Sequence, residues 1–594
     1  APERLLPAGT QLYLRWDGYA AHREAYDRSA FGRLLAGDAG RSLRLLTGHL
    51  EQLAESELLG EPLLDGAPPE ELEKLRSDWR AARRLPHLLA ERGLIVAAEV
   101  RWPWLSPNLL GTLGRLMGDE PEAELLPRPF VTLIIPGAGS DPEPALAALR
   151  LLARAYDVEP HAAEVAGRKL TLVGPERERI AGWVEGKHLV VATGAPTPAQ
   201  LVRRVADAGA GITAVPAFRR LQEFKEFRPV ARGYFRADSL TRTLRPVTQP
   251  FAPEVWATLD ELGLTRLRQV SFWQGFEGEA TRTVVELEPM GGRRGLGKVL
   301  KREPIKLADL PPLPQDVSRW AAARIDLNEA YDVLLTLSLL GETGRGEEAG
   351  ASPRERREQE IDQSLGFKVR EDLLAALGDR VVTYQSPGEA VSNFGQAVAV
   401  SVRDEAALRR GFGRLAGLAV LLSGALGPAQ VTDYHGVPVH QFPAGFLTPS
   451  YAVCDGWLVA AFYPQPVYGF ILRAKGEIPA WKPDARTAAT LARLPEDTVA
   501  LQYTDPRVSA RLMISYGPLA LSAIQDAALG DPRGRPLDLV GLIPHADSFC
   551  GPLFPNVTAV RDDGEVWRWD SRDSFSLPPE IIPPEMAYFI GLFN

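Results

Sequence analysis

The stretch "YAVCDGWLVAAF", residues 451–462, reads as two short apolar strands joined by an Asp-Gly turn. Asp-Gly between two runs of this kind is a strong local signal for a β-hairpin. A similar stretch, "GWVEGKHLVVAT", occupies residues 182–193. The recurrence of this hairpin predicts that the module containing it also occurs twice.

The segments around the two hairpins follow one another in the same order. Residues 130–156 read as a strand, a turn and an amphipathic helix, and residues 163–174 read as a further hairpin. Residues 395–422 and 432–442 repeat that order in the second half of the chain. We therefore expect an α+β fold with two related halves in a pseudo-twofold arrangement. Each half would be an antiparallel sheet covered by helices on one face.

The expected domains follow from this duplication. The first half spans residues 1–295 and the second spans residues 317–594, with a linker at 296–316 whose prolines favour an extended chain. A helical insertion is expected near 60–93 in the first half. The charged, glycine-rich stretch near 341–360 predicts a loop in the second half.

Composition excludes several classes of protein. The 594 residues carry a net charge of −9, which argues against nucleic acid as a partner. No run of 18 apolar residues occurs, so no membrane span is expected. The two cysteines, Cys454 and Cys550, either form one disulfide or are two buried thiols.

The chain ends carry signals of location. The sequence starts Ala1-Pro2-Glu3, which is typical of a mature end left by signal-peptide cleavage. We therefore expect an exported protein of the periplasm, the cell envelope or the extracellular space. The apolar segment "MAYFIGLFN", residues 586–594, is a candidate contact with a membrane-associated complex.

A short strand that ends at an aspartate before a helical pattern recurs along the chain. Aspartate is a good N-cap at such a junction, because its carboxylate accepts the unpaired N–H groups of the first helical turn. The expected structural helix caps are Asp17, Asp141, Asp238, Asp326, Asp404 and Asp505.

Two longer stretches resemble a known family. They are "LPAGTQLYLRWDGYAAHREAYDRSAFGRLL" at 6–35 and "LGFKVREDLLAALGDRVVTYQSPGEA" at 365–390, which contains a Leu-Gly-Asp motif. Together they resemble secreted bacterial proteins of a family of unknown function, found in planctomycete-type genomes. The resemblance implies an exported protein of unknown role, and it supplies no catalytic residues to transfer.

Motifs for chemistry are sparse. Residues 291–299 match the GxxxxGK spacing of a phosphate-binding loop, but Val299 stands where Ser or Thr should hold Mg²⁺. No GxSxG or HExxH motif is present. His435, His440 and Asp433 lie within eight residues and are the weak candidates for a metal site. The sequence predicts no cofactor and no catalytic set.

These observations favour a non-catalytic exported protein that acts by protein binding or self-assembly. It would be an accessory or structural subunit of an envelope or extracellular complex. One alternative is a hydrolase with its site in the groove between the two halves. A second alternative is a glycan or small-ligand binding protein that uses exposed aromatic faces, with Trp567 and Trp569 on one side of a strand.

Overall fold

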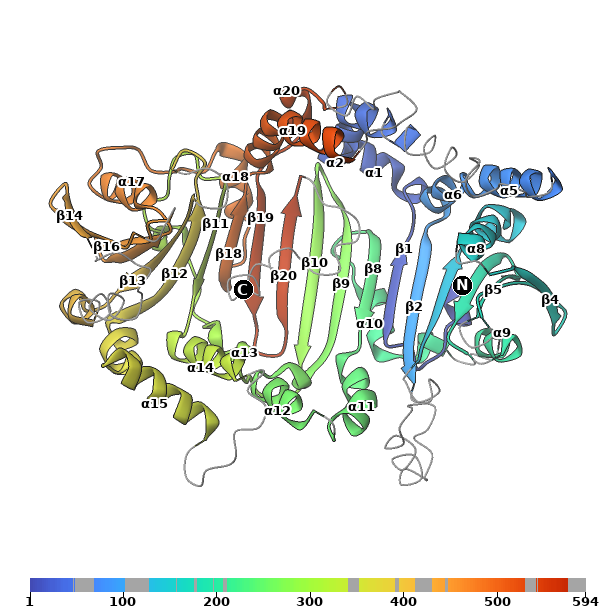
Figure 1. The fold of residues 1–594 in the computed structure, drawn as a ribbon, viewed down its shortest axis with the longest axis horizontal. Helices are drawn as coiled ribbons and strands as arrows, with labels where there is room; N and C mark the ends of the chain where they lie inside the picture. Colours follow the sequence, from blue (N-terminus) through green and yellow to red (C-terminus); the bar gives the residue numbers. More distant parts are fainter. Residues whose placement is uncertain are drawn as a thin grey trace.

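In the computed structural model of the chain, the strands form one continuous antiparallel sheet with helices around it (Figure 1). The fold is therefore α+β. The residues that the structure describes are 1–45, 47–48, 69–101, 128–155, 158–175, 179–195, 197–206, 211–250, 252–339, 352–389, 395–411, 430–443, 447–528, 541 and 543–574. The apolar segment 586–594 lies outside these residues.

Twenty strands make up the sheet in the described part of the chain. From one edge to the middle, the spatial order is β4 (His161–Val165), β5 (Arg168–Val173), β6 (Ile180–Glu185), β7 (His188–Thr193), β3 (Arg128–Ile135), β2 (Leu94–Arg101), β1 (Leu12–Trp16), β8 (Pro229–Phe235), β9 (Leu267–Glu277) and β10 (Ala280–Pro289). The order continues with β20 (Trp567–Asp573), β19 (Asn556–Asp562), β18 (Thr498–Thr504), β11 (Arg319–Arg324), β12 (Leu377–Gln385), β13 (Gln396–Val402), β17 (Trp457–Ala461), β16 (Ser450–Cys454), β15 (Val437–Gln441) and β14 (Gln430–Tyr434).

The first ten strands and the last ten are arranged in the same order, counted from the outer edge inwards. The pairing register agrees as well. Ala181 pairs with Ala192 in one set, and Ser450 pairs with Ala461 in the other. The displacement is 269 residues, the difference between 450 and 181. It is unchanged at the edge, where the pair at positions 161 and 172 has its counterpart at 430 and 441.

The hairpin at 451–462 is present as expected from its turn residues. β16 and β17 are joined by Asp455 and Gly456, which both have positive φ, at 52° and 74°. A two-residue turn of this type needs two left-handed residues, and glycine and aspartate tolerate that conformation. The hairpin at 182–193 is likewise present as β6 and β7.

The helices pack around the ends and both faces of the sheet. They are α1 (Arg23–Arg28), α2 (Ala30–Ala36), α5 (Pro69–Ala82), α6 (Leu85–Arg92), α8 (Glu143–Ala155), α9 (Pro198–Ala206), α10 (Pro216–Glu223), α11 (Ala237–Thr248), α12 (Pro253–Glu261), α13 (Leu296–Val299), α14 (Leu327–Ser338), α15 (Pro353–Leu365), α17 (Pro464–Ala474), α18 (Ala485–Leu491), α19 (Pro506–Ala528) and α20 (Ala546–Cys550). Helices α2, α19 and α20 lie at one end of the strands, and α11, α12 and α14 lie at the other (Figure 1).

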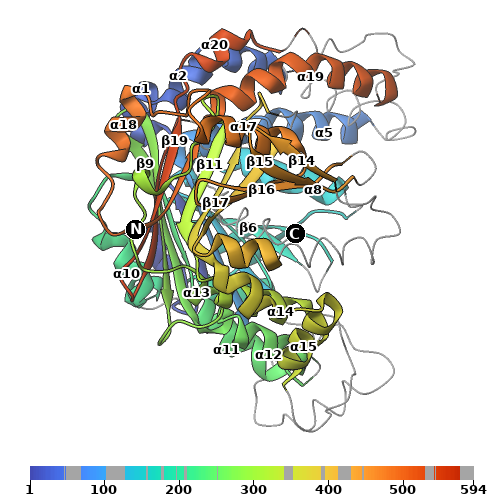
Figure 2. The same ribbon diagram turned by 90° about the vertical axis from the view of Figure 1, so that its left-hand side faces the viewer.

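Helices cover both faces of the first sheet half, whereas the sequence pattern indicated one. Val190 packs in a core with Leu201 of α9, and its neighbour Leu189 packs with Ala145 of α8. Consecutive strand residues point to opposite faces, so the apolar run of β7 is buried on both sides. Figure 2 shows α10 and α18 on one side of the sheet and α5 and α8 on the other.

The segments between the main elements are more ordered than their composition indicates. Residues 69–92 form α5 and α6, in the region of the expected helical insertion. The expected linker packs into the second core through Ile305 and Leu313. The expected charged loop is helical from Pro353, because Ser352 and Glu355 form a reciprocal capping box before the helix. Residues 340–351 lie outside the described part.

Candidate functional site

The two sets of ten strands meet at β10 and β20, where the sequence predicts a groove. These strands are hydrogen-bonded neighbours, with Val284 opposite Asp570 near the middle of the ladder. The backbone of the sheet is therefore continuous from one set to the other (Figure 1). We call this junction the seam.

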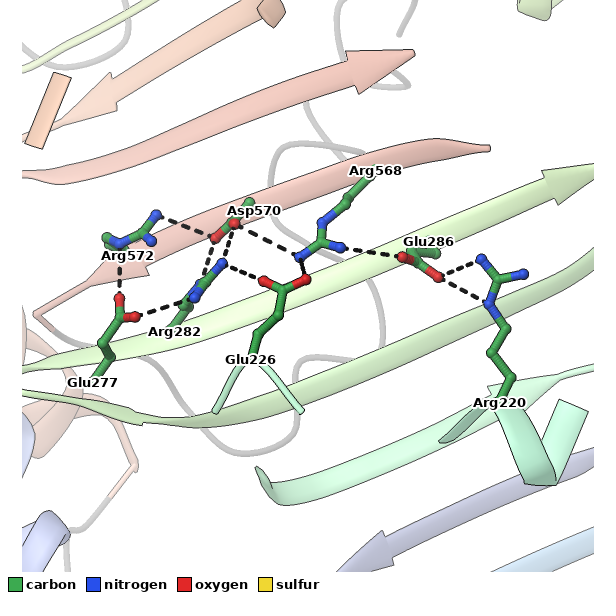
Figure 3. A network of polar contacts seen from close by, with 8 residues as sticks. All are labelled: Arg220, Glu226, Glu277, Arg282, Glu286, Arg568, Asp570 and Arg572. Carbon is green, nitrogen blue, oxygen red and sulfur yellow. Dashed lines mark hydrogen bonds and ion pairs between the residues drawn. The ribbon is translucent and has the colours of Figure 1, made fainter. Parts of the chain in front are cut away.

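Charged side chains gather on one face of the seam. Strand alternation places Arg282 and Glu286 of β10 on the same face as Arg568, Asp570 and Arg572 of β20. Arg220 from α10, Glu226 from the loop after α10 and Glu277 from the end of β9 approach that face. Figure 3 shows these eight side chains as one connected network, which we call the seam network.

Arg282 is the central residue of the seam network. Its Nε and Nη2 atoms donate to the two carboxylate oxygens of Asp570 at 2.9 and 2.6 Å. It also donates to Glu226 at 2.8 Å and to Glu277 at 3.1 Å. Its side chain is 9% exposed and that of Asp570 is 14% exposed. A bidentate pair with this little solvent contact is the strong form of arginine–carboxylate interaction.

The network continues through Glu286 to the helix layer. Arg568 donates to Glu286 at 3.4 Å, and Arg220 donates to the same carboxylate at 2.8 and 3.1 Å. Arg568 also donates to Glu226. The carboxylate of Glu286 thus connects Arg568 on β20 with Arg220 on α10. The contacts hold α10 and the two middle strands together.

The seam network is electrically balanced, with four guanidinium groups and four carboxylates. Burial lowers the pKa of Arg282, but the hydrogen bonds and charge of Asp570 outweigh burial, and the net effect raises the pKa. Every carboxylate of the network accepts from at least one arginine. Such a set is suited to holding two elements together and offers no free acid–base pair.

A shallow cavity of about 520 Å³ lies beside the seam network. Arg220, Glu226, Glu286 and Arg568 line it, together with Trp273. Trp273 is buried and stacks on Phe224 with ring centroids 4.6 Å apart. Four of its charged lining residues belong to the network, so a ligand that bound to them would compete with existing ion pairs.

The opposite face of the seam carries Trp567 and Trp569. Both are half-buried and belong to an apolar cluster with Phe272, Val285 and Leu287. The indole nitrogen of Trp567 donates to Asp562 at 2.9 Å. The two rings are edge to face, with centroids 6.3 Å apart. They are packed against the sheet and do not form a flat exposed platform.

An exposed apolar surface occurs instead on α19. Among the described residues, the three large apolar side chains with the greatest exposure are Leu519 at 74%, Met513 at 73% and Tyr516 at 60%. Leu512, one turn before Tyr516, is 38% exposed. We call these four residues the α19 stripe. The other side of the helix packs inward, where Ala510 joins a buried cluster.

The six expected helix-capping aspartates have different roles. Asp326 is the N-cap of α14 and accepts from the N–H groups of Asn328 and Glu329. Asp404 accepts from the N–H of Ala407, and Asp505 accepts from that of Arg507. The other three make ion pairs: Asp17 with Arg15, Asp141 with Arg84 and Asp238 with Arg242.

The candidate metal ligands do not converge. His435 lies at the β14–β15 turn and contacts Glu477 at 3.0 Å, and Asp433 accepts from Gly436 within that turn. His440 stacks on Tyr451 with centroids 4.6 Å apart, and burial lowers its pKa. The described residues contain no group of three His, Cys, Asp or Glu placed to hold a metal ion.

Both cysteines are free, so the structure selects the thiol alternative over the disulfide. Cys550 is buried in the cluster beneath α19, and Cys454 is half-buried at the end of β16. Burial raises the pKa of both thiols. In the described part of the chain, no helix combines the length and the apolarity needed to cross a bilayer.

The seam network was not predicted from the sequence. The charges at 568, 570 and 572 alternate with period two, which indicates a charged strand face. Nothing local identifies their partners, because Arg282 and Asp570 are 288 positions apart. A second missed group is Arg473 of α17, which forms an ion pair with Glu389 after β12.

No protein-family model and no curated protein matches this chain. Two solved structures, crystal forms I and III of a protein called TP0453, are similar over 50% and 49% of this chain and 81% of theirs. Both have a TM-score of 0.22 and 9% sequence identity with this chain.

Proposed function

We propose that this chain is a non-catalytic exported protein that acts by protein binding or assembly, with the α19 stripe as its docking surface. The observation that carries the proposal is the outward exposure of Leu519, Met513 and Tyr516 on one helix. Exposed apolar patches of this kind are typical of interaction sites. The exported location rests on the family resemblance of the sequence.

The partner we propose is the same helix of a second copy of the chain. Leu512, Tyr516 and Leu519 have the i, i+4, i+7 spacing with which one helix packs on another. No charged residue occurs from Leu512 to Gln525. Two copies, each with a net charge of −9, therefore meet along this stretch without opposing like charges. A self-complementary stripe favours a twofold dimer.

We further propose that the chain itself arose by duplication, with halves 1–295 and 317–594 related by a pseudo-twofold axis at the seam. Its support is the common strand order and the displacement of 269 positions that the outer four strands of the two sets share. The antiparallel pairing of β10 with β20 agrees with such an axis, because these two strands occupy equivalent places in their sets.

The two alternative functions have less support. A hydrolase at the seam would need a carboxylate free to move a proton, and Glu226 and Glu286 are each held by arginine. A glycan-binding face would need exposed indole rings, and Trp567 and Trp569 are half-buried in an apolar cluster.

Light scattering coupled to size-exclusion chromatography tests the proposal over a range of concentrations. We expect wild-type protein to form a concentration-dependent dimer, and M513E/L519E to be monomeric with an unchanged circular dichroism spectrum. Val255→Glu is the matched control, because Val255 is an exposed apolar residue on α12, away from the α19 stripe. A wild-type monomer at every concentration, or a dimer unaffected by the double substitution, would reject the proposal.

A further inference from the structure

The most exposed sulfur-containing residue in the described part of the chain lies on the α19 stripe. The chain has four methionines, and the structure describes two of them, Met290 and Met513. Met513 is 73% exposed, whereas Met290, which follows β10, is partly buried. Cys454 is partly buried and Cys550 is buried. Among the described sulfur groups, the thioether of Met513 is thus the most open to a reagent in solvent.

The sequence of α19 explains why this thioether is open. Residues three and four positions away lie next to Met513 on the helix surface. Three of these four neighbours are small, namely Ser509, Ala510 and Gly517. Small side chains cover little of a long thioether, and the fourth neighbour, Tyr516, is itself 60% exposed. The helix therefore leaves the sulfur of Met513 open to solvent.

The two cysteines are poor competitors for an oxidant. A thiol reacts with a peroxide as the thiolate, and burial raises the pKa of both Cys454 and Cys550. The thiolate fraction of each is therefore small near neutral pH. A thioether has no proton to lose, so its oxidation does not need an ionisation of this kind. Exposure and ionisation together select Met513 as the site of oxidation.

The other half of the chain has leucine at the equivalent place. Helices α11 and α19 begin 269 positions apart, at Ala237 and Pro506. The same displacement places Leu244 of α11, which is partly buried, at the position of Met513. Leucine and methionine are similar in volume, and both favour helices. The helix therefore does not need a sulfur atom at this position.

We infer that Met513 is an oxidation site through which a peroxide controls assembly of the chain. The inference rests on the proposed dimer of the α19 stripe. The sulfur lone pair attacks one oxygen of hydrogen peroxide, and the O–O bond breaks. That oxygen remains on the sulfur as a sulfoxide, while the other leaves as water after proton transfer. The sulfur loses two electrons, and the peroxide is reduced.

Oxidation puts a polar group in the α19 stripe. The sulfoxide oxygen must lose its bound water when the dimer forms, and the side chains of Leu512 and Leu519 offer it no hydrogen-bond donor. Burial of a polar group under these conditions should weaken the dimer roughly 10- to 100-fold. The reaction takes place on the monomer, because the dimer covers Met513. Methionine sulfoxide reductases reverse it, so the control is reversible.

Peptide mapping by mass spectrometry, after timed exposure of the full chain to hydrogen peroxide, tests the site. In wild type, we expect the sulfoxide to form at least about fivefold faster at Met513 than at Met290. Its formation should slow as the protein concentration rises, because the dimer covers Met513. Equal rates at Met513 and Met290 would overturn the inference.

Light scattering coupled to size-exclusion chromatography, before and after the peroxide, tests the control of assembly. Oxidation should weaken the dimer in wild type and in Met290→Leu, the matched control, and a methionine sulfoxide reductase should restore it. Met513→Leu keeps the other three methionines, and its dissociation constant should be the same before and after treatment. A wild-type dimer that is unchanged when Met513 is fully oxidised overturns this inference alone. A wild type that is monomeric before oxidation rejects the proposed function, and the control of assembly fails with it.

Discussion

Truncation of Arg282 should weaken the molecule more than truncation of an exposed arginine with similar hydrogen bonds. Arg282 is 9% exposed and makes two bonds to Asp570. Breaking a buried ion pair on one side costs about 3–5 kcal/mol, because the remaining charge stays buried. Asp570 keeps a bond from Arg572 at 3.3 Å, which lowers the cost. We therefore expect Arg282→Ala to cost about 3 kcal/mol.

The control is Arg409→Ala. Arg409 donates to Glu405 at 2.9 and 2.6 Å, so the number and length of its bonds resemble those between Arg282 and Asp570. Its side chain is 44% exposed, and exposed pairs of this spacing are worth about 0.5 kcal/mol. The difference between the two variants isolates the effect of burial.

The assay is urea unfolding at pH 7, followed by tryptophan fluorescence, for wild type, the two single variants and a double-mutant cycle. The cycle combines Arg282→Ala with Asp570→Ala, and it measures the coupling of the pair. We expect a coupling energy of at least 1 kcal/mol. If Arg282→Ala costs no more than Arg409→Ala, or if the coupling is near zero, the seam network does not hold the two sets of strands together.

Two further predictions concern single aspartates. Asp326→Ala removes the cap that accepts two N–H groups at the start of α14 and should cost about 1 kcal/mol. Asp141→Ala breaks a surface pair with Arg84 and should lower the free energy of unfolding by less than half of that amount. Thermal unfolding of both variants measures the two effects. Burial raises the pKa of Asp17, but the contact with His22 and the charge of Arg15 outweigh burial and lower the pKa to about 2. The stabilisation by Asp17 is thus present above about pH 4 and lost as pH falls toward 2. Asp17→Asn should flatten acid unfolding in that range, as followed by circular dichroism.

Local signals predicted the hairpins and the helix start at Asp326. Asp455-Gly456 and Gly436 adopt positive φ because their residue types tolerate it, whatever the rest of the chain does. The expectation of aspartate helix caps agreed less well with the structure where the aspartate had a charged partner nearby. Asp17 and Asp238 bond to Arg15 and Arg242, and the N-cap of α11 is Arg236.

The sequence by itself determined the α+β class, the recurrence of the hairpin and the strand alternation that puts Arg568 and Asp570 on one face. These features depend on residues a few positions apart, where turn geometry and periodicity act. Only the tertiary structure decided that β10 pairs with β20, because an edge strand carries no local mark of its partner. It likewise decided that Glu389 forms an ion pair with Arg473, since the partner of a buried charge lies on a segment that is distant in the chain.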